Sequence, residues 1–178
     1  GRTGTFFAHQ AAGVIPDLMT LSKGITGGYM PLSVVLCRDQ IFQAFYADEI
    51  SRGFLHSHSY TGNALACSAA LAVLDIFESD DVLSTNRARA RNILAASQPL
   101  QDHLRVHNLR QTGMITAFDV QTDDPLFSRR YHFAALEEGL MLRPIGNTVY
   151  FMPPYVITDT DIEHMISGAR RALLSTLA

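Results

Sequence analysis

One lysine stands in a setting that could support covalent chemistry. Lys23 follows the apolar run Leu18–Ser22 and precedes Gly24, Gly27 and Gly28. A lysine amine held among apolar groups loses its proton readily, and the neutral amine attacks carbonyl carbons. Glycines beside the lysine permit unusual backbone angles and leave room for a flat ligand. An ordinary lysine in a flexible surface loop fits the same pattern, and composition alone favours that simpler interpretation.

A phosphate-binding loop of the G-x-x-x-x-G-K-[ST] type does not fit this stretch. Lys23 is followed by Gly24 rather than Ser or Thr, and the glycines that should precede the lysine are missing. The lysine therefore has to be explained by another kind of site.

A second stretch, HSHSYTGNALAC at residues 56–67, gathers hydroxyl groups just before an expected helix. Ser57, Ser59 and Thr61 precede Asn63, and hydroxyls with free amides at a helix N-terminus can bind an anion. A simple helix cap explains the pattern at least as well. His56 and His58 have no third ligand at helical or hairpin spacing, so no metal site is expected.

A third stretch, LMLRPIGNTVYFMPPYVIT at residues 140–158, carries one arginine in an apolar segment. Arginine is the usual bidentate partner of a carboxylate, so Arg143 could bind an acidic substrate or form a structural ion pair. Tyr150 alternates with Val149 and Phe151, which places its side chain on the opposite face of a strand.

Alternating helices and strands must position these residues. The sequence predicts buried strands at 18–22 and 32–37, and a long, buried apolar helix from Asn63 to about Ser79. A break at residues 79–81 separates two predicted domains, 1–79 and 80–178. The second domain should contain helices at 82–104, 131–138 and 159–174, a strand pair at 106–121 with a turn near Gly113, and short strands at 140–143 and 149–152. This order indicates an α/β domain followed by a smaller α+β domain.

Composition narrows the class of protein. The chain is 47% hydrophobic and 17% charged, as in ordinary globular proteins. The net charge of −3 and scattered basic residues argue against nucleic acid as a partner. No apolar run is long enough to cross a membrane, and Cys37 and Cys67 form no paired motif, so a cytoplasmic location is expected. The start GRTGTFFAHQ resembles the middle of a domain, which predicts a piece of a longer polypeptide.

Four segments in order together resemble the class III, fold type I pyridoxal-phosphate aminotransferases. GRTG resembles the end of the stretch that follows the cofactor-nitrogen aspartate, and PDLMTLSKGITGGYMPLSVVL resembles the segment with the Schiff-base lysine. HSHSYTGNALACSAALAVL resembles the phosphate loop and the following helix, and LRPIGNTVYFMPPYVIT resembles the substrate-carboxylate segment. The resemblance covers nearly the whole chain and implies the C-terminal part of the fold type I large domain followed by the small domain.

The resemblance implies a role for each candidate residue. Lys23 would form the internal aldimine with pyridoxal 5'-phosphate. His58 and Ser59 would approach the cofactor phosphate of the partner subunit in a homodimer with a shared active site. Ser57, Arg143 and Tyr150 would contact the substrate, with Arg143 on its carboxylate.

Two departures from the family pattern are small: Ser59 stands where many members have Thr, and Ala64 where many have Pro. Other family elements would lie before Gly1: the aspartate on the pyridine nitrogen, the ring-stacking aromatic residue and a Gly-Ser phosphate turn.

The run from Arg143 to Tyr155 is similar to family members that convert 8-amino-7-oxononanoate into 7,8-diaminononanoate in biotin biosynthesis. The expected reaction is ping-pong transamination of small-molecule substrates, with S-adenosylmethionine as the amino donor, although some relatives use lysine. Two alternatives remain at this point. One is a class III transaminase acting on an ω-amino acid, and the other is a non-catalytic fragment lacking the N-terminal cofactor contacts.

Overall fold

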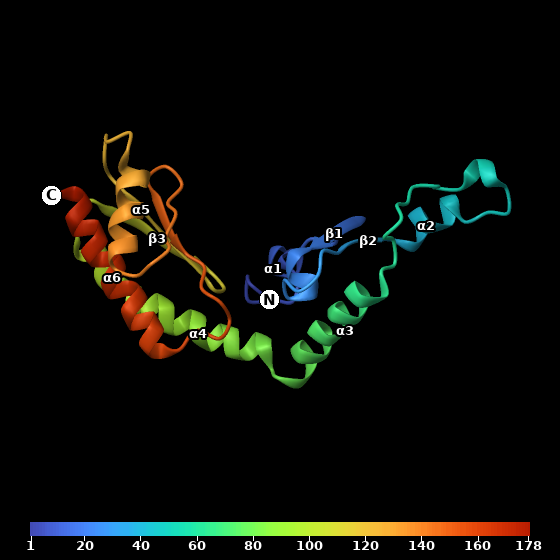
Figure 1. Ribbon diagram of the computed structural model, residues 1–178, viewed down its shortest axis with the longest axis horizontal. Coiled ribbons are helices and arrows are strands. Elements are labelled where there is room, and N and C mark those ends of the chain that lie inside the picture. The colour runs from blue at the N-terminus through green and yellow to red at the C-terminus, as the bar shows by residue number, and fades with distance from the viewer. The chain divides into compact units, whose positions relative to one another are not determined.

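A computed structural model describes residues 1–178, and the chain divides into two compact units (Figure 1). One unit is Gly13–Asp81, and the other combines Gly1–Ala12 with Val82–Ala178. The first residues pack with the C-terminal unit, because the Met114 N–H donates to the Arg2 carbonyl at 2.9 Å. The assignment of residues 1–79 to a large domain and 80–178 to a small domain stays a prediction.

The Gly13–Asp81 unit is built around a two-stranded antiparallel sheet that pairs Leu18 with Cys37 and Ser22 with Ser33. Its elements are β1 (Leu18–Ser22), η1 (Lys23–Thr26), β2 (Ser33–Cys37), α2 (Asp39–Phe45), η2 (Ile50–Arg52) and α3 (Ala64–Ser79). The two strands and α3 form where the sequence predicts them. Helix α3 packs against η1, the short 3-10 helix that begins at Lys23.

The expectation that these strands and α3 are buried is wrong for this chain. Leu18 is 56% exposed on β1, and Val35 is 63% exposed on β2. Only Ala66 and Ala70 are buried on α3, whereas Leu65 is 72% exposed. A two-stranded sheet and one helix offer too few partners to cover apolar side chains on every face.

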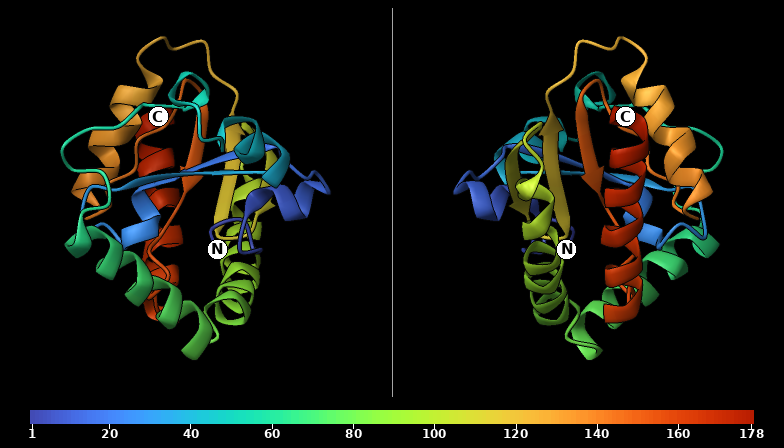
Figure 2. Two further views of the ribbon diagram at one scale, coloured as in Figure 1. Left: turned by 90° about the vertical axis from the view of Figure 1, so that its right-hand side faces the viewer. Right: turned by 90° about the vertical axis from the view of Figure 1, so that its left-hand side faces the viewer.

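The C-terminal unit is a three-stranded antiparallel sheet, ordered β3-β4-β5, with helices packed on one face (Figure 2). Its elements are α1 (Ala8–Ala12), α4 (Val82–Ser97), η3 (Gln98–Asp102), β3 (Val106–Thr112), β4 (Ile115–Val120), α5 (Phe127–Glu137), β5 (Thr148–Phe151) and α6 (Asp159–Leu177). No helix of the chain combines the length and the apolar character that a bilayer crossing requires.

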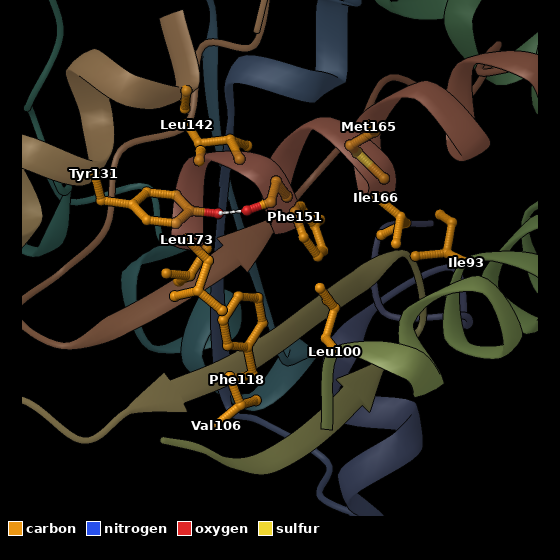
Figure 3. Packing of buried hydrophobic residues seen from close by; sticks show 14 of the residues in the cluster. Ile93, Leu100, Val106, Phe118, Tyr131, Leu142, Phe151, Met165, Ile166 and Leu173 are labelled. Carbon is orange, nitrogen blue, oxygen red and sulfur yellow. Dashed lines mark hydrogen bonds between the residues drawn. The ribbon is translucent and has the colours of Figure 1, made fainter. Parts of the chain in front are cut away.

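The core of this unit lies between the sheet and α4, α5 and α6 (Figure 3). Phe118 and Phe151 point from neighbouring strands toward the helices, with ring centroids 6.0 Å apart. Tyr131 of α5 is fully buried, and its hydroxyl donates to the Ala169 carbonyl of α6 at 3.0 Å. Burial raises the pKa of Tyr131 above its ordinary value, so the hydroxyl stays a donor. This bond fixes α5 against α6.

Several predicted boundaries in this unit are corrected. Helix α4 ends at Ser97 instead of running to residue 104, because Pro99 disfavours the helical angles of the preceding residue and begins a 3-10 turn. Helix α5 begins at Phe127, earlier than residue 131, after the Asp124 carboxylate accepts the Leu126 N–H at 2.8 Å. Helix α6 runs three residues beyond the predicted end at 174.

The predicted strand at 140–143 does not form. That segment belongs to no strand, and the nearest pairing outside a strand is the isolated bridge between Ile145 and Thr148. The strand predicted at 149–152 does form, as β5.

Candidate active site

Lys23 has a backbone conformation that is unusual for a residue with a side chain. It follows β1 directly and has φ 55°, in the left-handed region. Such a conformation costs about 1 kcal/mol or more for a residue other than glycine. The adjacent turn is held by Thr26, which is 1% exposed and donates its hydroxyl to the Met30 carbonyl at 2.6 Å. The fold therefore imposes a strained conformation on Lys23, as is common at functional sites.

The three glycines near Lys23 serve two purposes. Gly27 and Gly28 have φ 60° and 87°, as predicted for a turn that other residues rarely adopt, whereas Gly24 has no positive φ. A Cβ atom at Gly24 or Gly28 would meet nothing within 4 Å, so both open onto free space. A Cβ atom at Gly27 would lie 3.3 Å from the Val73 side chain, so this glycine instead allows α3 to approach the turn.

The loop before α3 is organised by local hydrogen bonds. The Asn63 side chain caps α3 and accepts the N–H groups of Leu65 and Ala66 at 3.0 and 3.2 Å, which confirms the predicted cap. The backbone N–H of His58 donates to the Thr61 hydroxyl at 3.1 Å. Its Nδ1 accepts the Tyr60 N–H at 3.1 Å, so the neutral imidazole carries its proton on Nε2.

A pocket of about 1160 Å³ joins these two segments within the Gly13–Asp81 unit. Lys23 and His58 both line it, together with the glycines of the turn and the side chains of Tyr29, Tyr60 and Thr61. Ser57 and Ser59 are exposed and lie outside this lining. The structure thus unites the candidate nucleophile with one of the two predicted phosphate-binding residues.

Arg143 and Tyr150 line a second pocket, of about 510 Å³, in the C-terminal unit. Most of its lining is apolar, including Leu142, Met152 and Pro153. Arg143 is exposed and takes part in none of the four ion pairs of the chain, so a structural ion pair does not explain it. A free guanidinium beside apolar walls suits a ligand with a carboxylate and a hydrocarbon chain.

Sequence reasoning missed two features of the first pocket. The left-handed conformation of Lys23 has no signal in the sequence beyond the neighbouring glycines, and the buried hydroxyl of Thr26 depends on how the turn folds. Among the hydroxyl residues that the sequence offers before α3, the fold places Thr61 in the pocket lining and leaves Ser57 and Ser59 outside it.

The family model of class-III aminotransferases matches residues 1–173, and the chain belongs to that family. The chain is 46% identical over 175 residues to an adenosylmethionine-8-amino-7-oxononanoate aminotransferase of Helicobacter pylori, covering 94% of this chain and 40% of that protein. It is 39% identical over 187 residues to the protein of the same name from Nitratidesulfovibrio vulgaris, covering 98% of this chain and 34% of that one.

Solved structures agree on the fold. The enzyme of the same name from Methanocaldococcus jannaschii has a TM-score of 0.86 at 31% identity, covering 98% of this chain and 43% of that chain. An amine transaminase from an uncultivated Pseudomonas species, in the PLP-bound internal aldimine form, has a TM-score of 0.89 at 33% identity, covering 99% and 42%. The resemblance to the fold type I transaminases is thus confirmed. The chain spans about two fifths of the length of these relatives.

Proposed function

We propose that this chain is the C-terminal part of an enzyme that transaminates 8-amino-7-oxononanoate to 7,8-diaminononanoate, with S-adenosylmethionine as the amino donor. The observation that carries the proposal is Lys23, strained and exposed on a glycine-bordered pocket shared with His58. The names of relatives up to 46% identical support this substrate and this donor.

The pocket fits pyridoxal 5'-phosphate in two respects. The open space beside Gly24 and Gly28 accommodates a flat ring next to the lysine amine. The loop ahead of α3 offers the Thr61 hydroxyl and the proton on His58 Nε2 to a phosphate. The exposed hydroxyl of Ser59 belongs to the same loop and is proposed as a further phosphate contact. When bound, the cofactor acts as an electron sink that makes the proton on the amine-bearing carbon acidic.

The residues of this chain then divide the work. The Lys23 amine would hold the cofactor and would move a proton from the amine-bearing carbon of the donor as a general base. Its position beside the reacting carbon supplies most of the advantage over a free amine. Arg143 would bind the carboxylate of the keto acid, with Tyr150 in the same pocket. Ser57, in the loop before α3, stays a predicted substrate contact.

The proposal is tested on the full-length enzyme. Borohydride reduction in the presence of pyridoxal phosphate should place a stable adduct on the Lys23 peptide, and the Lys23→Ala variant should show no adduct and no turnover. An adduct on a different lysine of the enzyme would overturn the assignment. Product formation from 8-amino-7-oxononanoate with S-adenosylmethionine, and then with lysine, identifies the substrate and the donor.

A second candidate is transamination of ω-amino compounds. It is favoured by the likeness to an amine transaminase at 33% identity and to an (S)-enantioselective omega-transaminase of Thermomicrobium roseum at 30% identity and a TM-score of 0.90. Greater kcat/KM for a simple ω-amine than for the adenosylmethionine and 8-amino-7-oxononanoate pair would favour this candidate.

A further inference from the structure

Arg143 sits on an irregular segment that needs support from elsewhere in the fold. Residues 141–144 form no strand, so no sheet ladder fixes their backbone. Leu142 and Pro144 are buried, whereas Arg143 between them is exposed. The side chains on either side therefore anchor the segment in the core and direct the arginine outward.

Helix α5 donates two hydrogen bonds to this segment, one on each side of Arg143. The Ser128 hydroxyl donates to the Pro144 carbonyl at 2.8 Å. The His132 Nδ1 lies 2.7 Å from the Leu142 carbonyl. A carbonyl oxygen can only accept, so the His132 Nδ1 carries the proton and is the donor. The carbonyls of the two residues next to Arg143, Leu142 and Pro144, are thus both bound by side chains of a single helix.

The two donors lie on α5, a helix whose position is fixed by its packing on α6. Ser128 and His132 are four residues apart, so they lie one above the other on the same face of α5. The same helix is fixed to α6 by the buried Tyr131, whose hydroxyl binds the Ala169 carbonyl at 3.0 Å. The two bonds therefore transmit the fixed position of α5 to the backbone around Arg143.

We propose that Ser128 and His132 are positioning residues that hold the Leu142 and Pro144 carbonyls and so aim Arg143 at the carboxylate of the keto-acid substrate. Neither residue touches the substrate, and both act through Arg143. Loss of either bond lets the segment move and weakens the bidentate contact that a carboxylate requires. This inference rests on the proposed function of Arg143.

Steady-state and single-turnover kinetics of the full-length holoenzyme test the proposal. Ser128→Ala and His132→Ala should each raise the keto-acid KM about three- to tenfold, the effect of one lost hydrogen bond on an equilibrium. The half-reaction with the amino donor should stay within about twofold of the wild type. Ser128→Thr and His132→Asn keep a donor at the same place and should restore most of the affinity.

Arg143→Ala provides the background that separates positioning from general damage. In that variant, removal of Ser128 or His132 should change the keto-acid KM by less than about twofold, because the group on which they act is gone. Ser167→Ala is the matched control, since its hydroxyl also binds a backbone carbonyl, of His164 at 3.1 Å, but on α6. Equal effects in both half-reactions, or the same effects without Arg143, would overturn the proposal.

Hydrogen exchange tests the positioning even if the enzyme proves to use another substrate. The Ile145 N–H, bound to the Thr148 carbonyl at 2.9 Å, should exchange faster in the Ser128→Ala/His132→Ala double variant than in the wild type. Unchanged exchange over residues 141–147 would refute the proposal. Absence of 8-amino-7-oxononanoate turnover in the wild type would instead refute the proposed function alone.

Discussion

At the scale of single residues, chemistry and backbone strain coincide at Lys23. Its left-handed backbone, with φ 55°, is one of three such cases among the non-glycine residues of the chain. The hydrogen bond from Thr26 to the Met30 carbonyl and the packing of α3 on η1 hold the turn that imposes this conformation. An unfavourable backbone conformation beside a pocket indicates that the position of this side chain matters more for function than for local stability.

The strained backbone of Lys23 predicts that glycine gives a more stable protein than alanine at this position, the reverse of the usual order. In the apoenzyme, Lys23→Gly should be about 1 kcal/mol more stable than Lys23→Ala, because glycine adopts φ 55° without a steric penalty. Thermal or denaturant unfolding of the two variants measures the difference. At Ser84, exposed within α4, the order should be reversed, because glycine costs roughly 0.5–1 kcal/mol relative to alanine in a helix. Alanine proving the more stable residue at both positions would contradict the strain.

At the scale of elements, the turn between β3 and β4 is the docking point for the N-terminal segment. A Cβ atom at Gly113 would lie 2.4 Å from the Arg2 carbonyl oxygen, so the two backbones are in direct contact. The Arg2 guanidinium binds the Pro153 carbonyl and lies 4.6 Å from the centre of the Tyr155 ring. Residues at the start of the chain thereby stabilise the segment that follows β5.

Substitution of Gly113 should be more damaging than its backbone angle explains. Gly113→Ala combines the cost of φ 56° with a backbone clash, whereas Gly146→Ala has nearly the same angle, φ 57°, and open space around the new Cβ. We expect Gly146→Ala to lose about 1–2 kcal/mol and Gly113→Ala to lose clearly more. Unfolding of both variants in the full-length enzyme measures this difference, and equal losses would show that the contact with Arg2 contributes nothing.

At the scale of the whole molecule, many large apolar side chains of the Gly13–Asp81 unit are exposed. Phe54, Leu55 and Tyr46 are 70%, 80% and 72% exposed, and Leu65 of α3 is 72% exposed. Exposure on this scale is typical of a surface that another chain segment or another subunit covers. The homodimer, in which the loop with His58 and Ser59 would serve the cofactor of the partner, stays a prediction.

The shared site is tested with mixed dimers of the full-length enzyme. One chain carries Lys23→Ala, and the other carries His58→Ala with Ser59→Ala. If the loop acts on the partner's cofactor, one site of the mixed dimer regains both an intact lysine and an intact loop, and about half of the wild-type activity per dimer returns. Because His58 lines the pocket of its own chain's Lys23, action within one chain is the alternative, and it predicts no recovery.

Much of the chain could be predicted because its signals are local. The Asn63 cap, the turn at Gly113 and the alternation around Tyr150 depend on residues within a few positions of one another, and all three are found. The four motifs also occur in the order typical of the class-III aminotransferases, which is enough to identify the family. Errors arose where a helix end depended on Pro99 or Asp124 and where residues 140–143 had no strand partner.

The sequence by itself determined the family, because four motifs occur in the order typical of it, and it named Lys23, His58 and Arg143 as candidates whose roles stay predictions. Only the tertiary structure decided the strained backbone of Lys23, the pocket that joins it to His58, and the two bonds from α5 around Arg143. The pocket and the two bonds join residues that are 10 to 35 positions apart. Such contacts depend on how the secondary-structure elements pack against one another, and this packing cannot be inferred from local sequence periodicity.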